Sequence, residues 1–283
     1  MTAPLIVQVE NAEAARPQSG LSGAGLVYEY ETEGGISRFS AFFFGVPGSP
    51  VGPVRSARLA TIKLLRIYGG SLLYSGASQY VSGQLAASGL RSYNETSARG
   101  ALFRVGYRFA PHNLYTDQAH ASALEQRVNA APVGYQLWAR TDPAALPPGG
   151  TPAPRVTVPV SASERPVFTY DAASHGYRRT EPGTGLMIDA ASGAPWGTPN
   201  VVVLQVPVTV GPEVEDVSGT HGLDFGIVGS GTGQLLVGGQ IYPIKYTQGP
   251  SGPPQLTLDN GAPAPIVPGQ VLICLTRLGT AAG

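Results

Sequence analysis

The chain has 283 residues, which is enough for one large domain or two ordinary ones, and we expect two. Its 18 basic residues balance its 18 acidic residues, so no net field attracts nucleic acid or an anionic membrane surface. Only 13% of the residues are charged, while 38 are glycine and 26 are proline, a composition that favours strands, turns and ordered loops over long helices.

The first segments predict a strand followed by a hairpin. Residues 5–10, LIVQVE, form an apolar run that is typical of a buried strand. Two alternating runs flank Gly34 and Gly35, which suit a two-residue hairpin turn because glycine readily adopts positive φ. In that register Glu29 lies opposite Ser40, and the alternation predicts one apolar face and one acidic face. The acidic face would carry Glu29, Glu31, Glu33 and Arg38.

A helix is predicted over residues 53–68, because a proline suits its start and a glycine pair its end. This helix would place Arg55 and Arg58 in its first turn, where the helix dipole favours carboxylates over cations. Both arginines therefore require a negative partner, which is either a glutamate of the hairpin or a bound anion. Two further helices are predicted, over 79–88 and within 116–129.

A stretch rich in proline and glycine divides the chain. We predict an α+β protein with a mixed α/β N-terminal domain over 1–140, a linker over 141–154 and a β-rich C-terminal domain over 155–283. The glycine-rich residues 229–234 are predicted to form a hairpin turn, since no Lys-Ser/Thr pair and no helix follow them. Cys274 lies in an apolar alternating run and is predicted to be a buried, unreactive thiol.

Several motifs resemble those of a known family. Similar motifs occur in the same order in the YerB-like bacterial lipoproteins, catalogued as domain of unknown function 3048. The N-terminal half carries ARPQSGL, VYEYETEGGISRF, GPVRSAR, SGAS and RFAPHNLYT, and the C-terminal half carries YDAASHGYRRT, IDAASGAPWGTPNVVV, IVGSGTGQLLVGGQIYPIKY and LDNGAPAPIVPGQVLI. The resemblance implies a protein of the cell envelope or periplasm, tethered through a lipidated cysteine, with no established activity. This chain shows neither such a cysteine nor a run of about 20 apolar residues, so we expect any tether to belong to a longer precursor.

Polar residues on these motifs form a candidate binding site. Guanidinium forks at a helix N-terminus suit a carboxylate or phosphate, so we expect an anionic or glycan-like ligand, or an envelope protein as partner. In this interpretation Arg55 and Arg58 hold the anion, while the glutamates and Arg38 orient them. The same residues could instead form ion pairs that only fix the structure, and both interpretations remain open. The candidate ligand-binding residues are Arg16, Glu29, Glu33, Arg38, Arg55, Ser56, Arg58, Arg108, His112 and Asn113, and Gln18 is a further polar motif position.

Two alternatives to ligand binding are a purely structural envelope component and a hydrolase acting on cell-wall polymer. In the hydrolase, Glu29 or Glu33 would be the acid or base, although strand geometry separates their Cα atoms by roughly 13 Å. His112 is the other weak catalytic candidate, with Ser56 or Ser78 as nucleophile, but neither serine lies in a G-x-S-x-G motif. The histidine spacing matches no metal site, so we expect neither metal nor cofactor. In the C-terminal half we expect only turn capping and cross-strand bonding from Arg178, Arg179, Asp189 and Asn200.

Overall fold

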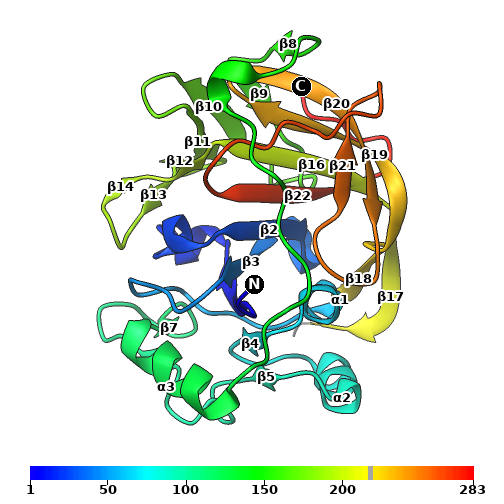
Figure 1. The fold of residues 1–283 in the computed structure, drawn as a ribbon. Coiled ribbons are helices and arrows are strands. Elements are labelled where there is room, and N and C mark those ends of the chain that lie inside the picture. The colour runs from blue at the N-terminus through cyan, green and yellow to red at the C-terminus, as the bar shows by residue number, and fades with distance from the viewer. Residues whose placement is uncertain (216–218) are drawn as a thin grey trace.

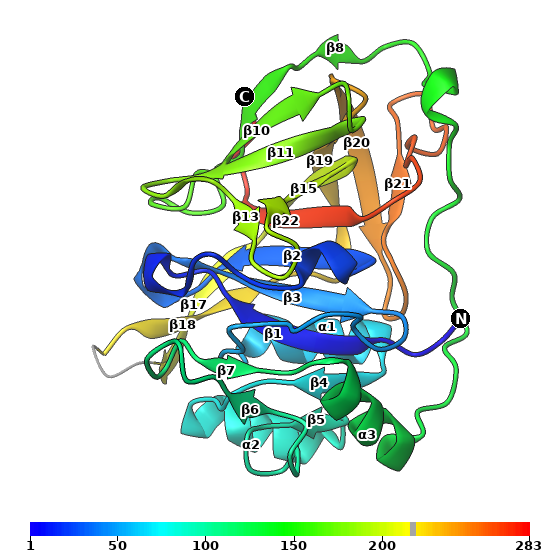
Figure 2. The ribbon, with the colours of Figure 1, turned by 90° about the vertical axis from the view of Figure 1, so that its left-hand side faces the viewer.

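One eleven-stranded mixed sheet runs through the molecule (Figures 1 and 2). The structure is a computed structural model, and it describes residues 1–215 and 219–283. Its strands are β1 (Leu5–Glu10), β2 (Leu26–Glu31), β3 (Ser37–Phe43), β4 (Ser71–Leu73), β5 (Ser92–Tyr93), β8 (Thr151–Pro152), β16 (Asn200–Val206), β19 (Gly229–Val237), β20 (Gln240–Gln248), β21 (Gln255–Thr257) and β22 (Val271–Arg277). Their order is β21-β20-β19-β16-β22-β2-β3-β1-β4-β5, with β8 paired to β20. Because β22 lies between β16 and β2 and is parallel to both, the two halves of the chain share the sheet.

Both faces of this sheet are covered. One face, here called the helical face, packs against α1 (Leu59–Tyr68), α2 (Gln79–Ser88) and the hairpin of β17 (Val208–Val214) and β18 (His221–Phe225). The opposite face packs against α3 (Gln118–Val128), the pair β6 (Phe103–Arg104) and β7 (Leu114–Tyr115), and a smaller sheet. The smaller sheet contains β9 (Arg155–Thr157), β10 (Val167–Asp171), β11 (Gly176–Glu181), β12 (Gly185–Leu186) and β15 (Gly197–Thr198), and β13 (Ile188–Asp189) pairs with β14 (Ala194–Pro195) beside it.

The α+β class predicted from the sequence is confirmed. The N-terminal half combines α1, α2 and α3 with strands of the mixed sheet, and the C-terminal half is mostly antiparallel β-structure. The segment between α3 and β8 is extended apart from a short 3-10 helix, and it passes along the molecule from one half to the other (Figure 1, green). The domain boundary expected within this segment stays a prediction.

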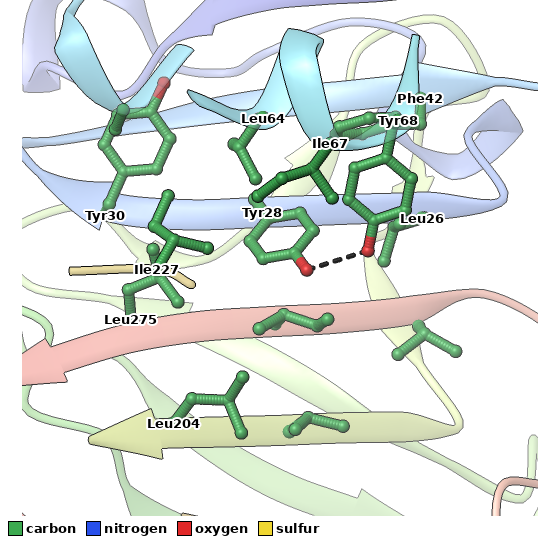
Figure 3. Close-up of a cluster of buried hydrophobic side chains, with 14 of the residues drawn as sticks. Leu26, Tyr28, Tyr30, Phe42, Leu64, Ile67, Tyr68, Leu204, Ile227 and Leu275 are labelled. Atoms are coloured by element: carbon green, nitrogen blue, oxygen red, sulfur yellow. Dashed lines mark hydrogen bonds between the residues drawn. The ribbon is translucent and has the colours of Figure 1, made fainter. Parts of the chain in front are cut away.

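The central strands of the main sheet are buried because both of its faces are covered, as is typical of strands with parallel neighbours. Every residue of β1 is buried. On the helical face, Tyr28 and Tyr30 of β2 lie beside Leu64 and Tyr68 of α1 (Figure 3). The hydroxyl oxygens of Tyr28 and Tyr68 are 2.8 Å apart, so the buried phenols satisfy each other (Figure 3).

The β2–β3 hairpin differs from the predicted register by one residue. Glu29 lies opposite Phe39, where the prediction placed Ser40. The turn comprises residues 32–36, closed by a backbone hydrogen bond and with both of its glycines at positive φ, so it is longer than the predicted two-residue turn. A shift of one residue moves a side chain to the other face of a sheet. The predicted acidic face was therefore wrong: Glu29 and Arg38 project to opposite faces, and both are buried.

Helix α1 begins at Leu59, six residues later than predicted, and ends before Gly69 as predicted. The preceding segment is extended because its backbone bonds to β1 and to the region of β7 instead of forming helical turns. Arg55 lies in this extended segment and Arg58 is the N-cap residue, so neither occupies the first helical turn.

Residues 229–234 also differ from the prediction, because they lie within β19 and do not form a hairpin turn. The predicted helices α2 and α3 and the burial of Cys274 are confirmed.

Candidate functional site

Several of the candidate residues lie where parallel strands end. Strands β1 and β2 are both antiparallel to β3, and β4 is parallel to β1, so the carboxyl ends of β1, β2 and β4 share one edge of the sheet. Ligand sites of sheets with parallel strands commonly lie at this edge. The side chains gathered here, called the edge cluster below, belong to Glu10, Glu33, Arg38, Arg55, Arg58 and His112.

A buried carboxylate holds two partly exposed side chains in the edge cluster. Glu10 Oε1 accepts a hydrogen bond of 2.9 Å from Arg55 Nε, and its Oε2 is 2.9 Å from His112 Nδ1. Glu10 is buried, whereas the side chains of Arg55 and His112 are 29% and 26% exposed. Within residues 1–215 and 219–283, neither Nη group of Arg55 makes a hydrogen bond. The bond from Nε therefore orients Arg55, and the two Nη groups, which form the fork of its guanidinium, remain free to bind a ligand.

The other half of the edge cluster is a closed ion-pair network. Arg58 donates to Glu33 from Nε at 2.7 Å and also from Nη2, and Arg38 Nη2 lies 3.4 Å from the same carboxylate. Although burial alone would raise it, the pKa of Glu33 is lowered by the hydrogen bond from Arg58 and the charge of Arg38. The cavity beside Arg58 has a volume of only about 10 Å³, too little for a ligand. For Arg58 and Glu33, the geometry matches the structural interpretation.

Glu29 and Arg16 belong to a second group on the opposite face of the sheet. Arg179 of β11 binds Glu29 through Nη1 and Nη2 at 2.5 and 2.6 Å, and binds Glu181 through Nε at 2.9 Å. Arg16 Nη2 donates to Glu164 Oε2 at 2.9 Å. Because Glu29 comes from the N-terminal half and Arg179 from the C-terminal half, these ion pairs join the two halves. This group, called the interface cluster below, comprises Arg16, Glu29, Glu164, Arg179 and Glu181.

The remaining candidates hold the loop that leads to His112. Arg108 donates to the backbone oxygens of Ala15 and Pro17, both at 2.7 Å. Asn113 Oδ1 accepts from Arg104 Nη1 at 2.6 Å. The structure therefore separates the ten candidates into three groups. Glu33, Arg38, Arg55, Ser56, Arg58 and His112 lie at the sheet edge, Arg16 and Glu29 lie in the interface cluster, and Arg108 and Asn113 support the loop.

Sequence reasoning missed other residues of these sites. The aromatic side chains of Tyr107 and Phe109 are 75% and 92% exposed on the loop that carries His112. Two aromatic residues in a polar loop were a signal that could have been used. Glu10 also gave a signal, since it is a charged residue at the end of an apolar strand. The pairing of Arg179 with Glu29 had no local signal, because 150 residues separate them.

The arrangement does not favour the candidate catalytic residues. Glu29 is fully buried against Arg179, and Glu33 is held by Arg58, which lowers the pKa of Glu33, so neither carboxyl group lies in an open cleft. In the part of the chain that the structure describes, the His112 ring bonds Glu10 and makes no hydrogen bond to Ser56 or to another serine. Within the same described residues, no three His, Cys, Asp or Glu side chains form a group that could hold a metal, and no helix is long and apolar enough to cross a membrane.

Comparisons with known proteins agree with the motif resemblance. The model of the "Protein of unknown function (DUF3048) N-terminal domain" matches residues 1–132, and that of the corresponding C-terminal domain matches residues 156–273. The "Putative lipoprotein YerB" of Bacillus subtilis (strain 168) is 30% identical over 261 residues, which cover 86% of this chain and 76% of that protein. The crystal structure of the YerB protein from Bacillus subtilis superposes with a TM-score of 0.77 at 26% identity, covering 97% of this chain and 90% of that one.

Proposed function

Because the chain belongs to the YerB-like DUF3048 family, for which no function is known, we propose from its own geometry that it binds an anionic glycan at the edge cluster. The observation that carries the proposal is the fork of Arg55, which is partly exposed and makes no hydrogen bond within residues 1–215 and 219–283. Guanidinium forks bind carboxylate and phosphate groups through two parallel hydrogen bonds. The binding partner of Arg55 is therefore an anion.

Glu10 prepares the site for this anion. Its carboxylate is buried and holds Arg55 and His112 at the same time, so both side chains are oriented before a ligand arrives. Such preorganisation lowers the entropic cost of binding. Glu10 also neutralises one positive charge, so the site recognises an anionic group without a strongly basic surface around it.

The exposed aromatic rings of Tyr107 and Phe109 favour a sugar over a bare anion. Both lie within five residues of His112 on the same loop, and large apolar side chains this exposed commonly mark an interaction site. The C–H face of a sugar packs against an aromatic ring, while its acidic group would reach Arg55. An envelope location is part of this proposal, since the relative from Bacillus subtilis is named a lipoprotein.

Calorimetric titration with a uronic-acid oligosaccharide tests the proposal, with a neutral oligosaccharide of equal length as the comparison ligand. We expect saturable binding of the acidic sugar, weakened at least about tenfold in Arg55→Gln because the charged hydrogen bonds are lost. The matched control is Arg178→Gln, which removes a partly exposed arginine that pairs with Asp171 in the C-terminal half. If Arg55→Gln does not fold, the double variant Tyr107→Ala and Phe109→Ala replaces it, since both side chains are exposed. Equal binding of the two sugars would refute the proposal, and so would an affinity of Arg55→Gln, or of the double variant in its place, that equals that of the native chain.

A further inference from the structure

A cavity of about 310 Å³ lies beside the interface cluster and shares no residue with the edge cluster. It forms where residues 16–18 of the N-terminal half meet β11 and the segment that follows it. Pro17 and Leu186 are exposed, whereas Gln18 and Met187 are buried, so the cavity extends inward from the surface. Its walls are mainly apolar, and its volume is typical of a site for a small molecule.

One buried acceptor that lines this cavity lacks a partner. Gln18 is fully buried, and its Nε2 donates to the backbone oxygen of Glu10 at 3.2 Å and to Asn11 Oδ1 at 2.6 Å. These two hydrogen bonds determine which way the amide is turned. Oε1 of Gln18 then accepts no hydrogen bond within residues 1–215 and 219–283. A buried acceptor without a partner destabilises the folded chain, so a ligand that donates a hydrogen bond to Gln18 Oε1 relieves this cost.

The charges beside the cavity favour a cation. The interface cluster contains three carboxylates and two guanidinium groups, and one of the carboxylates, Glu181, lines the cavity. Burial, together with the negative charges of Glu181 and Glu29, raises the pKa of Glu164 to about 8. At neutral pH a proton on Glu164 therefore balances the excess negative charge, and a bound cation would balance it equally well.

The arginine that lines the cavity has no free N–H group with which to bind an anion. Arg16 is the cationic side chain that lines the cavity, and all five of its N–H groups already have acceptors. These acceptors are Asn11 Oδ1, the backbone oxygens of Asn11 and Pro182, Thr184 Oγ1 and Glu164 Oε2. An acidic ligand would meet Glu181 without a free guanidinium to bind it.

We propose that this cavity binds a small primary amine with an apolar body, whose ammonium group donates to Gln18 Oε1 and lies beside Glu181. The apolar body fills the space between Pro17, Leu186 and Met187. This site is independent of the glycan site, because its recognition uses a cation and a buried acceptor rather than Arg55.

Benzylamine is a suitable probe, with benzyl alcohol and phenylacetate as neutral and anionic molecules of similar shape. We expect saturable binding of benzylamine by calorimetry or ligand-observed NMR, at least about tenfold weaker binding of benzyl alcohol, and no binding of phenylacetate. Absence of saturable benzylamine binding would overturn the proposal, and so would equal binding of phenylacetate.

Variants locate the binding. Leu186→Trp fills the mouth of the cavity and should weaken benzylamine binding at least about tenfold, whereas Val228→Trp adds the same ring at an exposed position outside the cavity and should leave it unchanged. Gln18→Leu removes the acceptor and should weaken binding of the amine more than binding of the alcohol. If Gln18→Leu does not fold, the comparison of Leu186→Trp with Val228→Trp tests the location of the site by itself. Unchanged affinity for benzylamine in Leu186→Trp contradicts the assigned site.

Discussion

Arg179 is a fully buried charge with contacts on several sides. Its guanidinium is fully buried, contacts the carboxylates of Glu29 and Glu181, and lies 5.2 Å from the ring centre of Phe39 and 5.5 Å from that of Phe168. A buried ion pair adds little to stability compared with a well-packed apolar group, but removing one partner leaves an unpaired buried charge. The charge pairing between the two halves of the chain therefore depends on Arg179.

Replacement of this arginine should therefore be costly. We expect Arg179→Leu to lower the free energy of unfolding by about 3–5 kcal/mol, because Glu29 and Glu181 lose their cation. The neighbouring Arg178 pairs with Asp171 while its side chain is 37% exposed, so Arg178→Leu should cost about 0–1 kcal/mol. Urea denaturation of both variants measures the difference. Similar losses in the two variants would show that burial of the pair does not matter.

At the residue scale, the sequence indicated which side chains carry charge but not which of them meet. Arg55 and His112 were chosen as site residues from their motifs, and the structure brings both to Glu10. Glu29 was assigned to the same site because a two-residue turn was assumed, and the longer turn moves it to the other face. Its partner, Arg179, was expected only to bond across strands of its own half. Long-range pairs of this kind depend on how the whole sheet assembles.

At the scale of elements, two turns with identical sequences have different roles. The tetrapeptide Asp-Ala-Ala-Ser begins at Asp171 and again at Asp189. In both turns the aspartate accepts a hydrogen bond from the backbone N–H two residues later, as expected for an Asx turn. Only Asp189 also accepts from Gly20 N at 2.7 Å and Ser22 N at 2.8 Å, and it is buried. The second turn therefore binds the N-terminal half, whereas the first turn only closes its own hairpin.

This difference predicts unequal effects of the same substitution. Asp189→Ala should lower the free energy of unfolding by about 2–4 kcal/mol, because two backbone N–H groups of the N-terminal half lose a charged acceptor. Asp171→Ala removes the same turn contact at a partly exposed site and should cost much less than Asp189→Ala, because water replaces the lost contacts. Thermal or urea denaturation of the two variants provides the comparison, and equal destabilisation would show that the contacts to Gly20 and Ser22 contribute nothing.

Elements whose pattern is local were predicted best. Strand β1 and helices α2 and α3 follow from apolar runs and from capping residues that need no distant partner. The start of α1 could not be predicted, because its preceding segment bonds to β1 and to residues beyond 110 instead of continuing the helix. The glycine-rich residues 229–234 form part of β19 for a similar reason: β16 and β20 pair with it on either side. Pairing with other strands or segments overrides local preference in such segments.

At the scale of the whole molecule, the two halves are joined by backbone pairing and by charge. Strand β22 of the C-terminal half pairs with β2 of the N-terminal half over five residues, in the middle of the main sheet. The interface cluster lies on one face of this junction, where Glu29 of β2 meets Arg179 of β11. The stability of the junction therefore depends on the protonation of the cluster as well as on apolar burial.

Titration of Glu164 makes the stability of the junction depend on pH in a way that can be measured. Its pKa is raised from 4.5 to about 8 by burial and by the nearby charges of Glu181 and Glu29, so the native chain holds a proton that the unfolded chain releases at neutral pH. Because the folded pKa is the higher one, this contribution to stability is complete below about pH 4.5 and is lost as the pH rises to about 8. Glu164→Gln keeps the neutral form at every pH and removes the contribution.

The difference in the free energy of unfolding between the native chain and Glu164→Gln, measured by urea denaturation at several pH values, should therefore change steadily across this window. The native chain should lose stability relative to the variant as the pH rises, and the difference should level off above about pH 8. Glu95→Gln, at an exposed position, is the control for loss of one carboxylate. Parallel curves for the native chain and Glu164→Gln would mean that no proton is held at Glu164, and that the excess negative charge of the interface cluster is balanced in another way.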